Sequence, residues 1–396
     1  QLELNSMKKW LKILLIIQIF INLVGALGPE LGFDALWYHL TEAKLFLQQR
    51  YLYPIPVNLL YWSGLPRLGE IFYMFLPGKL VHWAFGVLSA YFIYRLSGFA
   101  GALLWYSTLL VGWLSTSAYV DLIVTAFLLA AVYYQKVKRI LFIILASAVK
   151  LQGFAFGLAI TLIPWGILGI LPFSLINYQA TGNPFYPFLG QLNLTHEWFY
   201  NGFTYWLSRP IRLFFDPTYR VGPIILIVFL INSKYNKYLK LTLLSFFLWS
   251  LFPGTDFGRF ALFPLALMAL SALRPHRLVY YLIILQALVG ISGRAWANAK
   301  YLNQKDFLCR NLNFDFGDFY DCDGWFKQNI KPTDKVLIYN IHNLYYVDFP
   351  YDHESWQNPA TPYTHILVGD NGPEFNLPLI YQNSLTRVKL YLNEPQ

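Results

Sequence analysis

The residues best suited to chemistry lie in one polar stretch, 28–70, between two long apolar segments. Asp34, Tyr38 and Glu42 recur every four residues, and 3.6 residues per turn would place them on one helix face, with His39 beside them. A carboxylate held in this way can serve as a general base for a hydroxyl group. The stretch therefore predicts a catalytic loop, with a solvated connector as the alternative interpretation.

The apolar residues of the same segment fall on another face of the helix. A helix with acids on one face and aliphatic side chains on the other is typical of segments that lie on a membrane surface. We therefore expect the acids to point away from lipid, and the apolar face to be formed by Leu36, Leu40, Ala43 and Leu47.

A second set of charged residues lies at the edges of apolar runs or within them, where charge is costly and usually functional. Asp121 could bind a substrate or cap the helix that follows it. Lys150, in SAVKLQG, needs an acid or a phosphate as its partner unless it lies at a helix end. Arg259, in GRFALFPL, could neutralise a phosphate or extend its charge to the interface.

Two polar strings complete the candidates. In LPRLGE, Arg67 and Glu70 could form an ion pair that fastens the loop, or could take part in catalysis directly. In TGNPFYPF, two prolines stiffen an extended segment that could present Asn183 and Tyr186 to a sugar or a lipid. A structural hairpin is the alternative for the second string.

Composition places the chain in a membrane. Of its 396 residues, 56% are hydrophobic and only 13% are charged, whereas soluble domains are about 25% charged. The mean hydropathy is +0.41, and an aromatic content of 19% suits interfacial belts. The net charge of +9 would indicate nucleic-acid binding in a soluble protein, but here much of it flanks apolar runs. We expect membrane topology and lipid headgroups, rather than nucleic acid, to account for it.

Apolar runs and their basic flanks predict an all-α polytopic membrane protein with roughly nine or more transmembrane helices. Residues 1–6 (QLELNS) are interpreted as a vector scar, and 7–295 as the transmembrane domain with external loops 28–70 and 177–222. We expect the N-terminus inside, spans at 71–94 and 99–118, and broken helices within 140–178, where the crossings are unassigned.

The region 296–396 changes character and predicts a small α/β domain on the outer face. Its strand-like runs, VLIYNI, HILVG and RVKLYL, are separated by turn residues. Cys309 and Cys322, the only cysteines, are expected to form a disulfide there, with buried free thiols as the alternative. No metal-ligand spacing occurs in the sequence, so no cofactor is expected, and dependence on a divalent metal is left open.

FDALWYHL, directly after a membrane helix, and LPRLGE resemble the first external loop of the GT-C glycosyltransferases. The resemblance is to the protein O-mannosyltransferase and aminoarabinose transferase class, in a bacterial branch, and it covers most of the chain. It implies that Asp34 is the catalytic acid and that Asp121 is a second acid. Arg259 resembles the arginine of an RY-type motif, although Phe260 replaces the tyrosine. Donor or acceptor binding is expected of Tyr38, His39, Glu42, Arg67, Glu70, Lys150, Asn183, Tyr186 and Arg259.

The resemblance implies transfer of a sugar from a polyprenyl-phosphate donor to an acceptor glycan, lipid or protein. The expected location is the bacterial cytoplasmic membrane, with the active site and the C-terminal domain extracytoplasmic. One alternative is a lipid-linked oligosaccharide ligase or polymerase, although such enzymes commonly carry their large functional loop late in the chain. Another is a transporter without chemistry, although the sequence lacks the paired halves that this class predicts.

Overall fold

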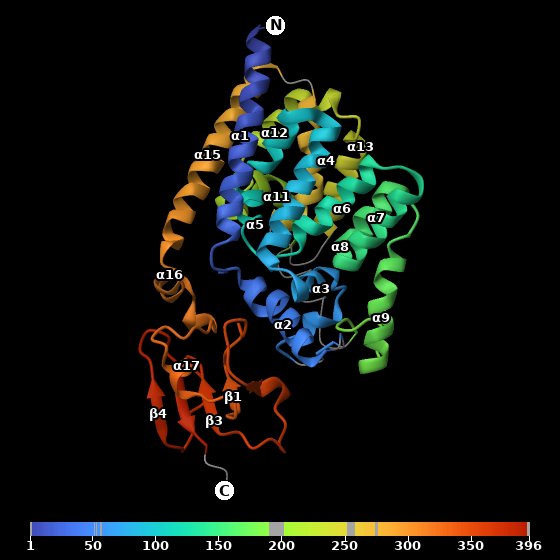
Figure 1. Cartoon of the computed structure of the whole chain (residues 1–396). Helices are drawn as coiled ribbons and strands as arrows, with labels where there is room; N and C mark the ends of the chain where they lie inside the picture. Colours follow the sequence, from blue (N-terminus) through green and yellow to red (C-terminus); the bar gives the residue numbers. More distant parts are fainter. Residues whose placement is uncertain are drawn as a thin grey trace. The chain divides into compact units, whose positions relative to one another are not determined.

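The computed structural model describes residues 2–50, 52, 54–55, 58–189, 202–251, 258–273 and 276–393. The chain forms two compact units (Figure 1). The first unit contains Gln1–Gly28 and Gly64–Ala299, and the second contains Pro29–Ser63 and Lys300–Gln396.

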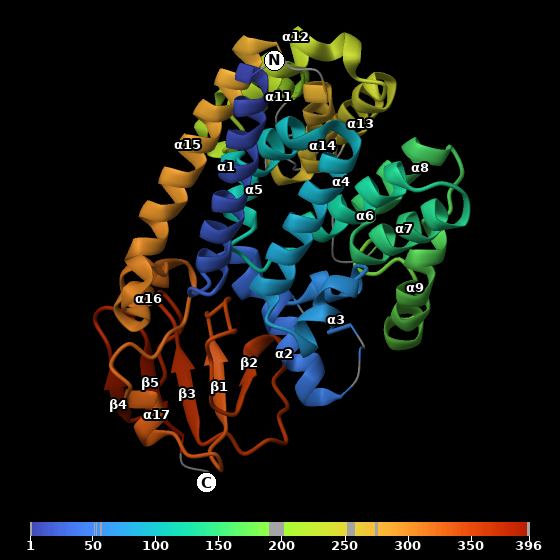
Figure 2. The same cartoon turned by 45° about the horizontal axis from the view of Figure 1, so that its top comes forward.

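The first unit is a helical bundle in which α1, α6 and α14 pack against α4, and α15 runs alongside α1 (Figures 1 and 2). Every residue of α6 from Asp121 to Val132 is buried, as expected for a helix that is apolar on all sides. The α-helices are α1 (Leu2–Ala26), α3 (Leu68–Phe75), α4 (Gly78–Tyr106), α5 (Leu109–Leu114), α6 (Asp121–Tyr133), α7 (Lys136–Val149), α8 (Leu151–Thr161), α9 (Ile167–Thr181), α11 (Gly202–Phe215), α12 (Ile224–Asn232), α13 (Leu239–Leu251), α14 (Leu262–Ala269) and α15 (Arg277–Ala299).

Within the described residues, three helices are long and apolar enough to cross a membrane: Met7–Ala26, Gly78–Tyr106 and Arg277–Ala299. Four shorter apolar helices accompany them: Asp121–Tyr133, Leu151–Thr161, Leu239–Leu251 and Gly258–Leu273. These helices are compatible with a membrane protein. The larger number of spans expected from the sequence is not confirmed.

Breaks in the helices follow local backbone chemistry. The predicted division between spans 71–94 and 99–118 falls at Gly98, whose φ of 79° interrupts α4. The predicted span boundaries are nevertheless wrong, because α3 ends at Phe75 and α4 continues to Tyr106. Within 140–178 the helices are broken as expected, since Lys150 adopts an extended conformation between α7 and α8. The second expected loop, 177–222, contains the unpredicted helix α11.

The second unit is built on a five-stranded sheet of order β2-β1-β3-β5-β4 (Figure 2). β1 pairs in parallel with β2 and β3, and β5 pairs antiparallel with β3 and β4. The sheet confirms the predicted C-terminal domain and its three strand runs, which became β1, β3 and β5. β2 and β4, the two short edge strands, were missed. The strands are β1 (Val336–Tyr339), β2 (Tyr351–His353), β3 (His365–Val368), β4 (Leu379–Gln382) and β5 (Lys389–Leu392).

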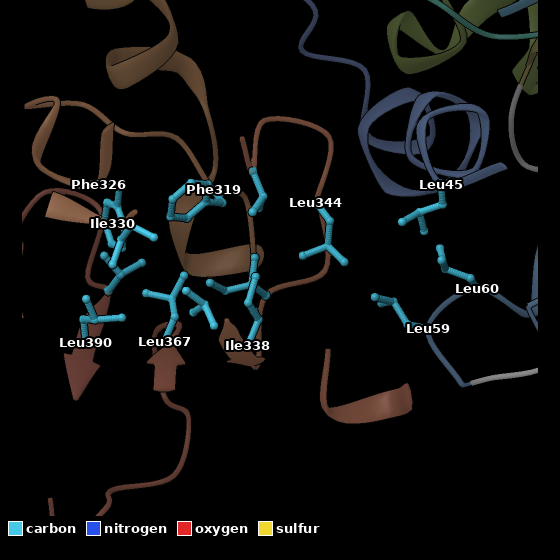
Figure 3. Close-up of a cluster of buried hydrophobic side chains, with 14 residues drawn as sticks. Leu45, Leu59, Leu60, Phe319, Phe326, Ile330, Ile338, Leu344, Leu367 and Leu390 are labelled. Atoms are coloured by element: carbon cyan, nitrogen blue, oxygen red, sulfur yellow. The ribbon is translucent and has the colours of Figure 1, made fainter. Parts of the chain in front are cut away.

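Alternation along the strands gives the sheet two apolar faces. Leu367 and Leu390 belong to one cluster, whereas their neighbours Ile366 and Tyr391 belong to another. This period of two is the geometry of a pleated strand with both faces covered. Phe326, in the short helix α17 (Trp325–Asn329), packs into the first cluster (Figure 3).

The main correction to the predicted domains concerns the polar stretch after α1. We expected 28–70 to be a loop of the transmembrane domain and the C-terminal domain to begin at 296. Instead, Pro29–Ser63 belongs to the same unit as the sheet. Leu45, Leu59 and Leu60 join Leu344 and the strand residues in one buried cluster, which Figure 3 shows. Burial of these leucines gives the segment a hydrophobic reason to fold with the sheet.

Polar contacts fasten the same segment. The Tyr346 hydroxyl accepts a hydrogen bond from the Glu30 amide and donates one to the Glu30 carbonyl, both at 3.0 Å. Lys44 Nζ donates to the Tyr345 and Val347 carbonyls at 3.0 and 2.5 Å. The carbonyls of Tyr345 and Val347 and the Tyr346 hydroxyl therefore find partners on the N-terminal segment.

Cys309, in α16 (Gln304–Asn311), and Cys322 form a disulfide. The bond closes a loop between residues 309 and 322, in the segment that leads from Lys300 toward the sheet. It therefore constrains the unfolded chain of the second unit.

We predict that Leu60→Ala destabilises the sheet although residue 60 is far from it in sequence. Leu60 is completely buried, and removing its side chain should cost about 2–5 kcal/mol. Hydrogen exchange of the full-length protein should show faster exchange of the β1 and β3 amides. Leu385→Ala is the matched control, because Leu385 is 56% exposed. Equal exchange in the two variants would contradict the assignment of 29–63 to this unit.

Candidate functional site

The candidate residues divide between the two units. Asp34, Tyr38, His39 and Glu42 belong to the second unit, together with the sheet. The other candidates belong to the helical unit: Arg67, Glu70, Asp121, Lys150, Asn183, Tyr186 and Arg259.

Asp34 immediately precedes the π-helix η1 (Ala35–His39), which leads into α2 (Leu40–Gln49). The Tyr38 hydroxyl donates a hydrogen bond to Asp34 Oδ2 at 2.6 Å. The predicted spacing of these two residues on one face is therefore confirmed. Asp34 is half-buried, so its carboxylate combines a fixed orientation with partial access to solvent.

Burial along η1 and α2 differs from the predicted amphipathic pattern. His39 and Glu42 are each only 2% exposed, whereas Leu47, expected on the apolar face, is 52% exposed. Leu36 packs with Leu308 and other residues of the second unit. The expected division into a solvated acidic face and a lipid-facing apolar face is therefore wrong. Leu36 thus finds its apolar environment inside the folded unit.

Aromatic rings gather next to Tyr38, the partner of Asp34, a feature that the sequence analysis did not use. Trp37 lies 5.5 Å from Phe33 and 5.5 Å from Tyr38 between ring centroids. Trp62 lies 6.1 Å from Tyr38. Trp37 Nε1 donates to the Leu59 carbonyl at 2.9 Å, which fixes the indole. Such rings provide flat apolar surfaces beside a carboxylate, an arrangement that suits the C–H faces of a sugar ring.

In the helical unit, Asp121 and Lys150 form a buried ion pair, with Lys150 Nζ 2.8 Å from Asp121 Oδ1. Their side chains are 2% and 17% exposed, respectively. Lys150 Nζ also lies 4.5 Å from the centroid of Phe260, and the Arg259 guanidinium lies 4.9 Å from the same ring. Arg259 also covers Tyr119 at 4.8 Å. The structure thus brings Lys150 and Arg259 to one phenylalanine and pairs Lys150 with Asp121.

His82 organises the N-terminus of α6 next to this group. Its Nε2 accepts a hydrogen bond from the Leu122 amide at 2.9 Å. Nδ1 lies 2.7 Å from the Leu114 carbonyl and 2.8 Å from the Ser117 carbonyl, so Nδ1 is the ring nitrogen that carries the proton. The neutral imidazole therefore caps one of the helix amides that have no intrahelical acceptor. Nothing in the local sequence indicated this role.

Arg67 is held by a residue that sequence reasoning missed. Its guanidinium donates to Asn177 Oδ1 at 3.2 Å and lies 5.6 Å from the ring centroid of Phe173. Asn177 Nδ2 donates in turn to the carbonyls of Gly64 and Tyr186, at 2.6 and 3.0 Å. A single buried asparagine thus ties LPRLGE to TGNPFYPF. In the sequence, the position of Asn177 at the end of an apolar run was the feature that could have indicated this role.

The TGNPFYPF string forms a closed turn. Asn183 Oδ1 accepts from the Phe185 amide at 2.9 Å, and its Nδ2 donates to the Phe188 carbonyl at 2.7 Å. Tyr186 packs so closely on Gly64 that a Cβ there would lie 2.3 Å from the tyrosine ring. These contacts favour the structural hairpin over a role for Asn183 in binding a sugar. Glu70 lies in the first turn of α3 and is 5% exposed.

In the described part of the chain, no group of three or more histidine, cysteine or acidic side chains is arranged to hold a metal ion. No family model, curated protein or solved structure matches this chain.

We predict that Asp121 and Lys150 are energetically coupled. Lys150→Met leaves a buried carboxylate without its ammonium partner and should destabilise the protein by about 3 kcal/mol. The double variant Asp121→Asn/Lys150→Met should cost less than the sum of the two single variants. Unfolding of the detergent-solubilised protein measures the cycle, with Lys138→Met, an exposed lysine, as the control. Additive effects would mean that the pair contributes no coupling.

Proposed function

We propose that the protein is a membrane glycosyltransferase that moves a sugar from a polyprenyl-phosphate donor to an acceptor hydroxyl. The observation that carries the proposal is the carboxylate of Asp34, which accepts a hydrogen bond from Tyr38, whose ring packs with Trp37 and Trp62. General-base catalysis requires such a group, and the rings suit a carbohydrate. The apolar helices suit a lipid-linked donor.

The proposed reaction requires one proton transfer and one displacement. Asp34 accepts the proton of the acceptor hydroxyl as its oxygen attacks the anomeric carbon. The bond between that carbon and the phosphate oxygen breaks, and polyprenyl phosphate leaves with the electron pair. Attack from the side opposite the phosphate inverts the anomeric centre. No oxidant or reductant is consumed.

Cations must stabilise the negative charge on the departing phosphate. We assign this role to Arg259, with Lys150 as the second cation. Both lie near Phe260, and Lys150 is held by Asp121. Asp121 is therefore proposed as the group that orients Lys150. His39, Glu42, Arg67 and Glu70, which are all buried, are proposed to support the residues that bind the donor and the acceptor.

The proposed setting is the bacterial cytoplasmic membrane, with roughly nine or more crossings that recruit the shorter apolar helices. Basic flanks such as QKVKR would lie inside, and the sheet-bearing unit outside. An oligosaccharide ligase or polymerase uses a related donor and remains the second candidate. We rank a transporter without chemistry below both enzymes, because the sequence lacks the paired halves that this class predicts.

We predict that Asp34→Asn preserves folding but lowers transfer on the order of a hundredfold or more, because the amide cannot accept the acceptor's proton. Transfer is measured with labelled polyprenyl-phosphate hexoses and pentoses in reconstituted membranes. Asp306→Asn makes the same chemical change at an exposed position of the second unit and should retain activity. Near-normal turnover by the Asp34 variant would exclude Asp34 as the base.

The proposed topology predicts opposite accessibility for two exposed lysines. Lys138 lies in the first turn of α7, and Lys327 lies in α17. In intact cells, an impermeant maleimide should label Lys327→Cys and leave Lys138→Cys unlabelled until the membrane is opened. Labelling of both from the same side would overturn the proposed orientation.

A further inference from the structure

The second unit contains a cleft of about 640 Å³ that the proposed transfer reaction does not use. Its walls come from the C-terminal half of α2, the segment before β1 and the segment before β2. This volume falls within the roughly 300–1,000 Å³ that small-molecule sites occupy. The lining residues are Lys44, Leu45, Gln48, Ile330, Lys331, Pro332, Lys335, Val347, Asp348, Phe349, Pro350 and Tyr351.

Hydrogen-bond donors outnumber acceptors among the polar side chains of the cleft. Three lysines line it, against one carboxylate, that of Asp348. Lys44 is committed to the 345–347 carbonyls and to Asp348, and Lys335 lies 3.3 Å from Asp352. Lys331 forms no ion pair with any residue that the structure describes. The cleft thus retains positive charge after its internal pairs are counted.

Tyr351 supplies a second and independent observation. Its hydroxyl is buried and makes no hydrogen bond within the described part of the chain. Burial, and then the nearby carboxylates of Asp352 and Asp348, raise the pKa of this phenol, so it stays protonated. A buried donor without an acceptor is costly, and an acceptor oxygen on a ligand would remove that cost.

We propose that this cleft binds a sugar phosphate or another phosphate ester of similar size. Lysine binds phosphate as a point charge, and three lysines line the cleft. Lys331 and Lys335 would hold the phosphate, and Tyr351 would donate to one of its oxygens. Gln48 and Asp348 can bond hydroxyl groups, while Leu45, Ile330 and Phe349 contact the apolar face of the ring.

The cleft is distinct from the acid at Asp34, although α2 connects them. Ten residues separate Asp34 from Lys44, which corresponds to roughly 15 Å along a helix. Binding in the cleft therefore requires neither the general base nor transfer activity, and it can be measured even if the proposed reaction is wrong.

Calorimetric titration of the full-length protein in nanodiscs with glucose 1-phosphate tests the proposal. We expect saturable binding that weakens with salt, and no binding of glucose. Lys331→Gln/Lys335→Gln should weaken binding on the order of tenfold or more, given the usual strength of hydrogen bonds to charged groups. Tyr351→Phe should weaken it less. The matched control, Lys305→Gln/Lys327→Gln, removes the same charge from exposed positions outside the cleft.

Two further arms identify the ligand class and its source. Glucuronate should bind weakly, and equal binding of glucuronate would overturn the assignment to phosphate. Vesicles containing phosphatidic acid test whether the bound phosphate belongs to a lipid headgroup. Their retention by the native protein, lost in the Lys331/Lys335 variant, would support the phosphate site with a headgroup as ligand. The proposal is overturned if neither phosphate source binds, or if the cleft and control variants behave alike.

Discussion

The structure of the second unit depends on the insertion of an N-terminal segment into a core built mainly by the last hundred residues. Leu45, Leu59 and Leu60 supply buried surface that the C-terminal strands alone do not provide. Lys44 and Glu30 satisfy backbone and hydroxyl groups of the 345–347 segment. Each contact joins residues about three hundred positions apart, so the unit forms only when both ends of the chain have been brought together. Such long-range closure carries an entropic cost that the apolar burial must exceed.

The helical unit meets a different constraint, which is to place charge among apolar helices. Lys150 achieves this by interrupting a helix: its extended backbone lies between α7 and α8, and its ammonium reaches Asp121 at the start of α6. Arg67 donates to the side-chain amide oxygen of Asn177. Each cation is therefore tied to the end of a helix, where an irregular backbone already requires polar partners. These charged side chains thus lie where helices break, because the helix ends supply polar partners for the charges and the charges supply partners for the helix ends.

Much of the secondary structure was predictable, since periodicity depends on neighbours in sequence. The strand runs around Val336, His365 and Lys389 were predicted for this reason, and helix breaks were expected between 94 and 99 and within 140–178. Domain membership was not predictable, because the polarity of 29–63 resembles that of a solvated loop. The few leucines that anchor it become significant only when the sheet is present. The pairing of Arg67 with Asn177 was hidden for the same reason, with 110 residues between them. The sequence indicated which charged and polar residues were candidates for a site. It did not indicate which residues they would contact, because those contacts are tertiary.

The backbone at Asp34 shows how tertiary contacts can specify the geometry of an acid. Residues 35–39 form a π-helical turn, which is rare and frequently occurs at functional sites. The Leu40 amide bonds to the Ala35 carbonyl, and the Thr41 hydroxyl donates to the Leu36 carbonyl at 2.6 Å, so the wide turn leaves neither carbonyl without a partner. Leu36 is buried and Trp37 is pinned to Leu59, which holds this turn against relaxation to a regular helix. The direction of the Asp34 carboxylate is therefore set by the packed core of the second unit. In the proposed reaction, an acid oriented in this way would be preorganised before the substrate binds, as electrostatic and general-base catalysis require.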